Sequence, residues 1–554
     1  MAVTPYTPDY NTLQLEILVN GTNDGLHTVL KKAEVHYELN KIPYAKLHFI
    51  SSNPDIDPED NPLQSDVLAV TDEIELKVNS GEDSETLFKG IVYKVAKNAD
   101  PSAGFETKVD CKDIAINLTS QLEVVADETF GEKMERFVQE VEMTNEVDLA
   151  AFGEETVTKT QNVSPWDYII SYLDGLGYMS NIREGIFTIY DSTADPEEAT
   201  YLAKNGVNVF EFEGREEESV ADVEVRYWNP ETQSVETQES STNVENASGK
   251  EVIDMSQSSF TPETLSQIAN AVAAKNRLAT VKGKVKTFGN LQAKYGENIS
   301  FEKVNPKIDE TPLLIREEHH TIDNGLWTTE YSFGLDDNKS FVEKINADTA
   351  DNTNRTGQNN NVQGLQIGIV TQIEDDPKNE FRVRVRIPSI SDSAEGVWAR
   401  LSSFQAGAER GAFFIPEVDD EVILGCLNNN PDTPVILGKL YSSSNPMPFP
   451  IEADNNIQGI VSREGTQIVI NDKDKSVEIS TTNGNKLLIS DEEKGFVLED
   501  ENGNSIKMNS DGITIESAKD IVLKAAKNIN VEGAQSSLKA QSKMELSGQL
   551  ITLN

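Results

Sequence analysis

Cysteine is nearly absent from this sequence, which has two cysteines among 554 residues. Cys111 and Cys426 both lie in strand-like settings, close to apolar neighbours such as Val109 and Leu424. Two isolated cysteines argue against a disulfide framework and against a cysteine-based metal site. Both are therefore expected to be small buried side chains.

Positive charge is scarce as well. The chain has 48 Lys and Arg against 94 Asp and Glu, a formal net charge of −46. Nucleic acids and anionic membranes bind proteins with a positive face, so this balance argues against both classes of ligand. No apolar run approaches the roughly 18 residues of a membrane helix. The start, Met1–Pro8, lacks a basic segment followed by an apolar one, so we expect no secretory signal and synthesis in the cytoplasm.

Motifs of the common enzyme classes are missing too. The sequence contains no Gly-x-Ser-x-Gly, no His-Glu-x-x-His and no phosphate-binding loop. We therefore expect no catalytic residue, no cofactor and no resident metal ion.

Two groups of metal-type ligands have a simpler interpretation. One acidic loop holds Asp55, Asp57, Glu59 and Asp60. It lacks the glycine and the terminal glutamate of a calcium-binding loop, and prolines stiffen it, so an acidic surface loop is favoured. The adjacent His319 and His320 would point to opposite faces of a strand, so they cannot easily share one ion.

Five short apolar or alternating runs do stand out between residues 363 and 441. Turn residues separate the runs, which are 364–370, 381–388, 397–401, 421–427 and 434–438. Such a pattern predicts a small closed barrel of the OB type. Arg382, Arg384 and Arg386 would share one side of a strand, where an OB barrel can touch nucleic acid. A solvated outer face balanced by carboxylates is the favoured alternative.

Three motifs in this region carry a family resemblance. Gly396–Leu401, Gly411–Val422 and Asn428–Gly438 follow one another in order. Together they resemble the signature of the OB domains of VgrG proteins and phage baseplate spikes. The resemblance implies the hub-spike family of contractile injection systems, with type VI secretion, phage or extracellular particles as the machine.

The residues before the barrel change period twice. Residues 1–120 alternate apolar and polar residues and predict an antiparallel barrel or sandwich, and residues 216–345 predict a second β unit. The resemblance implies that these units are the first and second hub β-barrels. Between them, residues 121–215 predict an α/β insertion, in which Ser164 caps a helix that begins at Pro165. The polar stretch 232–259 is expected to be a flexible excursion, and residues 346–362 a linker.

After a second linker, residues 442–456, the chain becomes repetitive. From Gln467 on, pairs of apolar residues two apart recur every six to ten residues. Each pair predicts a minimal strand with one inward face. The pairs include the residues we expect in a trimer core: Ile468, Ile470, Leu487, Ile489, Ile506, Met508, Ile513, Ile515, Ile521, Leu523, Ile529 and Val531.

One such unit buries almost nothing alone. Three chains wound together would solve this, each supplying one strand per layer, and residues 457–554 are therefore expected to form an intertwined trimeric β-helix. A meander closed within one chain is the alternative. The expected fold class is mainly β: a tandem β-barrel hub with a small α/β insertion, an OB-fold collar and a C-terminal β-prism needle.

The resemblance also implies a function and partners. The protein would be the homotrimeric spike of an injection machine, adapting a sixfold tube to a threefold needle. It would contact the inner tube protein, baseplate proteins, a PAAR-type tip protein, effector cargo and, transiently, a target membrane. No nucleic acid is expected. It would be assembled into the particle and delivered outward on contraction, and the tip protein would dock on Leu550, Ile551, Thr552, Leu553 and Asn554.

A second function class remains open. Trimeric β-helical tail spikes bind or cleave carbohydrate, which requires a groove lined with aromatic residues and paired carboxylates. From Gln467 onward the sequence has one aromatic residue, Phe496. This scarcity favours the injection spike.

Overall fold

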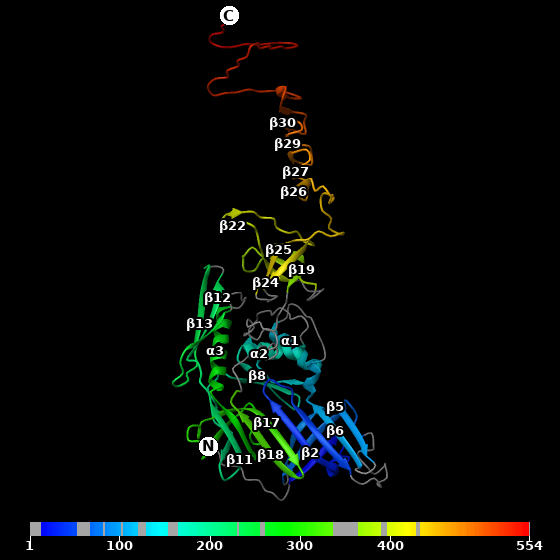
Figure 1. Ribbon diagram of the computed structural model, residues 1–554, viewed down its shortest axis with the longest axis vertical. Helices are drawn as coiled ribbons and strands as arrows, with labels where there is room; N and C mark the ends of the chain where they lie inside the picture. Colours follow the sequence, from blue (N-terminus) through cyan, green and yellow to red (C-terminus); the bar gives the residue numbers. More distant parts are fainter. Residues whose placement is uncertain are drawn as a thin grey trace. The chain divides into compact units, whose positions relative to one another are not determined.

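The computed structural model describes most of the chain (Figure 1). The described residues are 13–51, 67–80, 83–100, 104–119, 129–152, 164–229, 232–254, 261–335, 364–388, 396–427 and 433–552. They belong to two compact units, Met1–Leu440 and Tyr441–Asn554. The acidic loop with Asp55, the whole of the predicted linker 346–362, and Leu553 and Asn554 lie outside the described residues.

One twelve-stranded sheet dominates the first unit. Its main path runs β1 (Leu13–Val19), β4 (Glu73–Ser80), β5 (Asp83–Asp100), β6 (Gly104–Lys112), β3 (Tyr44–Ser51), β2 (Leu30–Glu38), β17 (Leu313–Asp323), β18 (Leu326–Phe333), β15 (Val281–Phe288), β11 (Val209–Glu216). Off this path, β10 (Tyr201–Lys204) pairs with β16 (Asn298–Glu302), which pairs with β17. A short 3-10 helix, η1 (Leu26–Val29), precedes β2.

The two predicted groups of hub strands are therefore hydrogen-bonded into one sheet. They meet where β2 runs antiparallel to β17, with His36 opposite His319. Alternating residues of these strands face a shared core that includes Val35, Phe88 and Tyr331. Pairing at this seam satisfies backbone groups that two separate sheets would leave unpaired at their edges.

Helices and short strands lie between the two strand groups, in the region of the predicted α/β insertion. It holds η2 (Ile114–Thr119), α1 (Phe130–Glu140), β7 (Thr144–Asn145), η3 (Leu149–Phe152), α2 (Pro165–Gly175), β8 (Tyr178–Arg183) and β9 (Ile186–Asp191). The predicted helix start is confirmed: Ser164 Oγ accepts from the Asp167 amide at 3.1 Å, and Pro165 is the first helical residue. Trp166, Ile170 and Leu173 pack into the core of the insertion.

The prediction of a flexible excursion over residues 232–259 is wrong for its described part. β12 (Asp222–Asn229), β13 (Ser234–Ser241) and β14 (Lys250–Asp254) form a three-stranded sheet, and helix α3 (Pro262–Leu278) packs against it. β13 is an edge strand of polar residues, so its sequence lacks the apolar alternation that marks a half-buried strand.

The predicted OB barrel is confirmed. β19 (Leu365–Gln372), β20 (Val383–Arg386), β21 (Val397–Leu401), β25 (Pro434–Lys439) and β24 (Glu421–Cys426) close in that order. Val370, Val385 and Leu424 fill its interior. Between β21 and β24 a small hairpin forms from β22 (Ala406–Gly407) and β23 (Arg410–Gly411). Cys111 is buried as expected, whereas Cys426 is half-buried at the end of β24.

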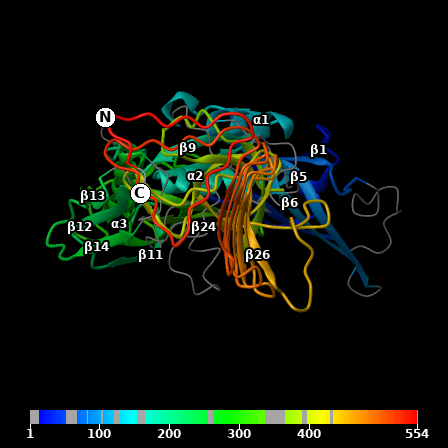
Figure 2. The ribbon, with the colours of Figure 1, turned by 90° about the horizontal axis from the view of Figure 1, so that it is seen from above.

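The second unit contains a seven-stranded antiparallel sheet. Its strands pair in chain order: β26 (Ile457–Val461), β27 (Gln467–Asn471), β28 (Ser476–Ser480), β29 (Lys486–Ser490), β30 (Gly495–Glu499), β31 (Ser505–Asn509) and β32 (Gly512–Glu516). Seen from above, the strands lie in register one behind another (Figure 2). These strands thus pair within one chain, unlike the predicted layers with one strand from each of three chains. Residues 517–552 form no strand within the chain.

Candidate functional site

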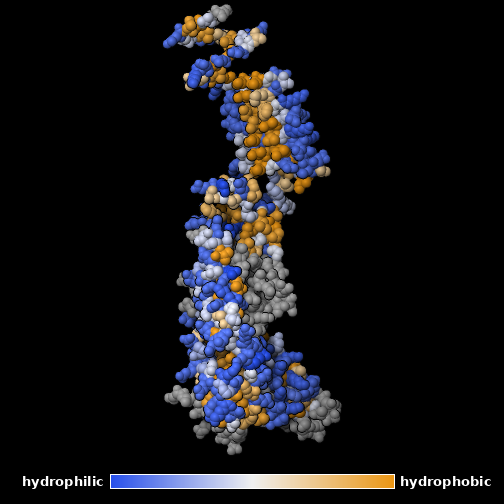
Figure 3. Space-filling model, turned by 60° about the vertical axis from the view of Figure 1, so that its left-hand side comes forward, coloured by the Kyte–Doolittle hydropathy of each residue, from blue (hydrophilic) through white to orange (hydrophobic). Residues whose placement is uncertain are grey.

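The predicted apolar pairs come together on one face of the C-terminal sheet. Cross-strand partners align them in two continuous rows. We call this the apolar face: Ile460, Ile468, Ile479, Leu487, Leu498, Ile506 and Ile515 in one row, and Ile470, Val477, Ile489, Phe496, Met508 and Ile513 in the other. Figure 3 shows it as an orange band along the sheet.

Burial on this sheet is the reverse of that in a soluble domain. Except for the half-buried Leu487, residues of the apolar face are 36–69% exposed, while the residues that alternate with them in β27 and β28, such as Val469 and Glu478, are half-buried. Fully burying one such side chain is worth about 1.5–3 kcal/mol. A contiguous exposed patch of this kind marks an interaction surface.

The opposite face of the same strands is mixed and charged. Its central row runs through Glu478, Leu488, Val497 and Lys507. Lys486 Nζ lies 3.2 Å from Glu478, and Lys507 Nζ lies 3.5 Å from Glu499. This face is compatible with exposure to solvent, whereas the apolar face needs a partner to cover it.

The apolar pairs beyond β32 are also exposed. Ile521, Leu523, Ile529 and Val531 have no strand partner in the chain, so the structure does not bring them together with the apolar face. Of the predicted tip residues, Leu550, Ile551 and Thr552 are exposed. Leu553 and Asn554 are not described.

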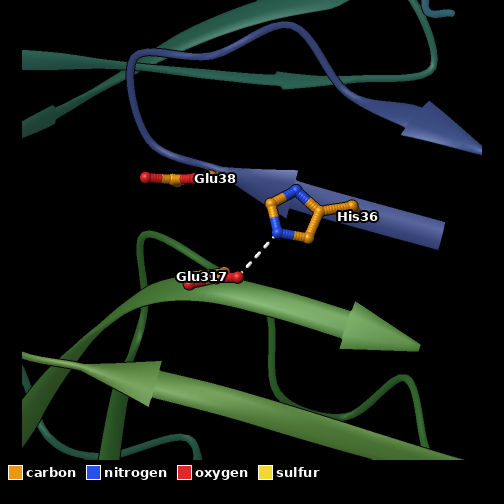
Figure 4. A group of neighbouring side chains, drawn as sticks. All are labelled: His36, Glu38 and Glu317. Atoms are coloured by element: carbon orange, nitrogen blue, oxygen red, sulfur yellow. Dashed lines mark hydrogen bonds and ion pairs between the residues drawn. The ribbon is translucent and has the colours of Figure 1, made fainter. Parts of the chain in front are cut away.

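His36, Glu38 and Glu317 form a candidate metal group at the seam between β2 and β17. One ligand atom from each lies within 4.8 Å of the others. Figure 4 shows the His36 ring facing Glu317, with Nε2 2.6 Å from the carboxylate. Sequence reasoning missed this group, because Glu317 lies 281 residues from His36.

The group fits a metal ion poorly, because cations already hold its carboxylates. Arg316 lies 3.2 Å from Glu38 and 3.4 Å from Glu317, and Lys41 lies 2.8 Å from Glu38. Burial would raise the pKa of Glu317, but bonds from His36 and Ser332 and the Arg316 charge lower it to about 2. The arrangement is an ion-pair network that fastens the two strand groups together.

His319 and His320 point to opposite faces of β17, as expected. His319 lies beside the His36 ring, with 5.4 Å between centroids. His320 is buried, and its Nε2 lies 2.6 Å from Glu318. Its Nδ1 faces Trp327 Nε1, which can only donate, so we assign Nδ1 as the acceptor and Nε2 as the nitrogen that donates to Glu318.

Glu318, on β17, is the centre of a buried ionic contact between the α/β insertion and the twelve-stranded sheet. Its carboxylate accepts from Arg183 Nη2 of β8 at 2.6 Å and from the Tyr295 amide at 3.1 Å. The Arg183 guanidinium also lies 4.1 Å from the centroid of the Tyr37 ring. Burial would raise the pKa of Glu318, but Arg183 and these bonds outweigh it and lower the pKa to about 2.

Acid is therefore expected to weaken the hub through Glu317 and Glu318. Both have pKa values of about 2, below their ordinary 4.5, so their stabilisation is present above pH 4.5 and is lost as the pH falls toward 2. The loss is on the order of 3 kcal/mol per group. Because other carboxylates titrate in the same range, we would compare thermal unfolding of the native chain with Glu318→Gln from pH 6 to 2. Equal pH slopes in the two proteins would contradict the assignment.

The arginine row of the barrel is engaged within the protein. Arg382 binds Asp376 through two nitrogens, with Nη2 2.6 Å from Oδ1 and Nε 3.1 Å from it. Arg384 Nε donates to the Gly396 carbonyl at 3.1 Å. These contacts favour the structural interpretation of the row over nucleic-acid binding.

Family models match three parts of the chain. The Alg8 N-terminal domain matches residues 9–309, more than half of the chain. The type VI secretion system/phage-baseplate injector OB domain matches residues 366–441, and the phage baseplate V C-terminal trimerisation domain matches residues 476–554. The resemblance inferred from the sequence motifs is confirmed.

Curated relatives match over a short segment. The type VI secretion system spike protein VgrG3 of Vibrio cholerae is 37% identical over 75 residues, 13% of this chain and 7% of that protein. The actin cross-linking toxin VgrG1 of the same species is 35% identical over 72 residues, 12% of this chain and 7% of that protein. The matched segment thus spans less than a tenth of each relative.

A solved structure shares the fold over nearly the whole chain. The half-lidded Francisella PdpA–VgrG complex has a chain 11% identical to this one, with a TM-score of 0.52. The similarity covers 91% of this chain and 87% of that one. Among the described helices, none is long and apolar enough to cross a membrane.

Proposed function

Because this chain belongs to the Alg8 N-terminal domain family and continues into the injector OB and trimerisation domains of phage-baseplate and type VI spike proteins, we propose that it is the trimeric central spike of a contractile injection machine. Three copies would form a hub from the twelve-stranded sheets, a collar from the OB barrels and a needle from residues 457–552.

The apolar face carries this proposal. Three sheets whose apolar faces turn toward a common axis bury both rows at once and leave the charged faces outside, which makes a three-sided prism. A single sheet of seven short strands with one apolar side open to water has no core of its own. Association of copies supplies that core.

Residues 517–552 support the same arrangement. Their backbone has no strand partner within the chain, although apolar pairs continue through Ile521 and Ile529. Backbone donors and acceptors in a stiff needle need partners. Strands of the other two copies would provide them, so the needle would pass from three in-chain sheets to an intertwined section.

The hub would adapt symmetry. Each copy contributes two strand groups, β1 to β6 and the group around β15, β17 and β18. Three copies would thus offer six strand groups, a number that suits contact with a sixfold inner tube, while the needle would be threefold. We propose that baseplate and tube proteins bind the hub, and that the needle transmits the thrust of contraction to a target membrane.

The role we propose is structural, without catalysis by this chain. The relative named as an actin cross-linking toxin is similar over 72 residues only, so its activity is not carried over. The alternative of a carbohydrate-binding tail spike loses support, because the exposed face is aliphatic and Phe496 is its only aromatic residue. Sugar sites rely on aromatic rings and paired carboxylates.

Effector and tip partners complete the proposal. The similar Francisella structure is a complex of a VgrG with PdpA, and we propose that this chain also carries cargo. A PAAR-type tip protein would dock on Leu550–Asn554, where Leu550 is 85% exposed.

Removal of Leu550–Asn554 is expected to abolish tip binding and leave the trimer intact, because the apolar face lies upstream. Pull-down of a tagged tip protein and the solution mass of the shortened chain measure the two effects. In the matched control, all five residues are replaced by serine. This variant keeps the length of the chain and removes only the native side chains of the segment. A tip protein that still binds the shortened trimer would contradict the docking site.

A further inference from the structure

A second exposed apolar element lies on the OB barrel. The connection from Ser402 to Ile415, which we call the collar arm, leaves the barrel after β21 and contains the hairpin β22–β23 (Figure 1). Phe404 and Phe413 are 87% and 84% exposed, and Phe414 and Ile415 are exposed too. Three phenylalanines in solvent within so short a segment are unusual for a soluble protein.

The collar arm has a preformed shape. The Ala412 amide donates to the Gln405 carbonyl at 3.0 Å, and Ser403 Oγ donates to the Ala412 carbonyl at 2.5 Å. These bonds close the base of the hairpin between Phe404 and Phe413. An ordered arm loses little conformational entropy when it binds, so its rings are ready for a partner.

The same barrel presents an exposed aliphatic surface, which we call the collar patch. It consists of Leu365 and Ile367 on β19 and Leu437 on β25, which are 42–60% exposed. Gly425 of β24 lies between them: a Cβ there would be 3.2 Å from Leu437 Cδ1 and 3.8 Å from Leu365 Cδ2. A Cβ at Gly425 would be crowded, so Leu437 and Leu365 close over this glycine and their side chains form the outer surface of the patch.

We propose that the collar arm of each copy packs on the collar patch of a neighbouring copy, so that three barrels close into a ring. This rests on the trimer proposed above. Arm and patch are complementary, because one offers exposed aromatic rings and the other exposed aliphatic side chains. An interface between two different surfaces of identical copies closes into a ring when the rotation matches the copy number.

A second copy is favoured as the occupant for two reasons. Arm and patch are both exposed in the single chain, so the arm does not cover its own barrel. In addition, only residues 440–456 separate β25 from β26, the first strand of the sheet that carries the apolar face. Trimerisation of that sheet would hold the barrels at an effective concentration of about millimolar, enough for a modest contact to form.

Cross-linking between differently tagged copies tests this contact. In a full-length chain with Cys426→Ser, one copy carries Phe413→Cys and the other Leu437→Cys, and the two are co-expressed and treated with a short bis-maleimide. We expect a covalent product of about 122 kDa, twice the 61.1 kDa chain, that contains both tags. Lys378→Cys, on the exposed β19–β20 loop, replaces Leu437→Cys as the control and is expected to give at least tenfold less product.

The other outcomes overturn the inference, and they separate it from the proposed function. A chain that carries both Phe413→Cys and Leu437→Cys and is cross-linked only within itself would show that the arm covers its own barrel. A chain that is trimeric by light scattering but gives no product with both tags would disprove the arm contact and leave the spike proposal standing. A chain that is monomeric would contradict both the arm contact and the spike proposal.

Discussion

Leu487→Asp is expected to leave the chain monomeric at micromolar concentration. Leu487 lies in the middle of the apolar face, between Ile479 and Leu498 on the neighbouring strands. In the trimer each copy would lose about 1.5–3 kcal/mol of apolar burial. It would also bury an unpaired carboxylate at a cost of several kcal/mol. Because all three copies carry the substitution, the penalty applies three times around one axis. We expect it to exceed the stabilisation from burial of the remaining residues of the apolar face.

Leu488→Asp is the matched control, because the next residue of the same strand faces the other way. Leu488 pairs with Glu478 and Val497 on the charged face, and Lys486 and Lys507 lie on that side of the sheet. We expect the trimer to persist, with a change in stability of about 1 kcal/mol or less. Analytical ultracentrifugation of both variants gives the answer. Trimers from Leu487→Asp, or equal losses in the two variants, would refute the assignment of the faces.

Arg183→Met is expected to destabilise the hub strongly. The substitution removes the cation beside the buried Glu318 and leaves its charge uncompensated, which costs about 3–5 kcal/mol. Hydrogen exchange in the full chain reports this locally: peptides of β8 and β17 should exchange roughly 10²–10⁴-fold faster.

Two controls separate the charge effect from lost packing. Arg183→Met with Glu318→Gln removes both charges, so it should recover part of the loss. Lys41→Ala breaks an ion pair that is exposed on the Lys41 side, at 2.8 Å from Glu38, and should cost less than about 1 kcal/mol. If Arg183→Met leaves exchange in β8 and β17 unchanged, the contact does not hold insertion and hub together.

The parts of the fold that local patterns encode could be predicted. Five separated apolar runs gave the OB barrel, and Ser164 followed by Pro165 gave the start of α2. The apolar pairs gave the rows of the apolar face, because residues two apart in a strand share one face. Each of these features depends on residues that are close in the sequence.

Long-range and edge features could not be predicted in this way. The seam between β2 and β17 and the contact of Arg183 with Glu318 join residues 281 and 135 positions apart, and nothing local marks them. β13 was not predicted as a strand, because an edge strand exposed to water needs no apolar alternation. In-chain pairing of β28 with β29 was open to prediction, since Asn483-Gly484 between them is a hairpin signal and Gly484 has φ 95°.

The solution mass of the full chain and of a chain ending at Ser443 tests the central claim most directly. Light scattering after size exclusion should give about 183 kDa for the full chain, three times 61.1 kDa, because three apolar faces meet on one axis. The shortened chain, which lacks that face, should lose the trimer or hold it far more weakly. A full chain that is monomeric with a folded C-terminal sheet would contradict the account, since the apolar face would then need no partner.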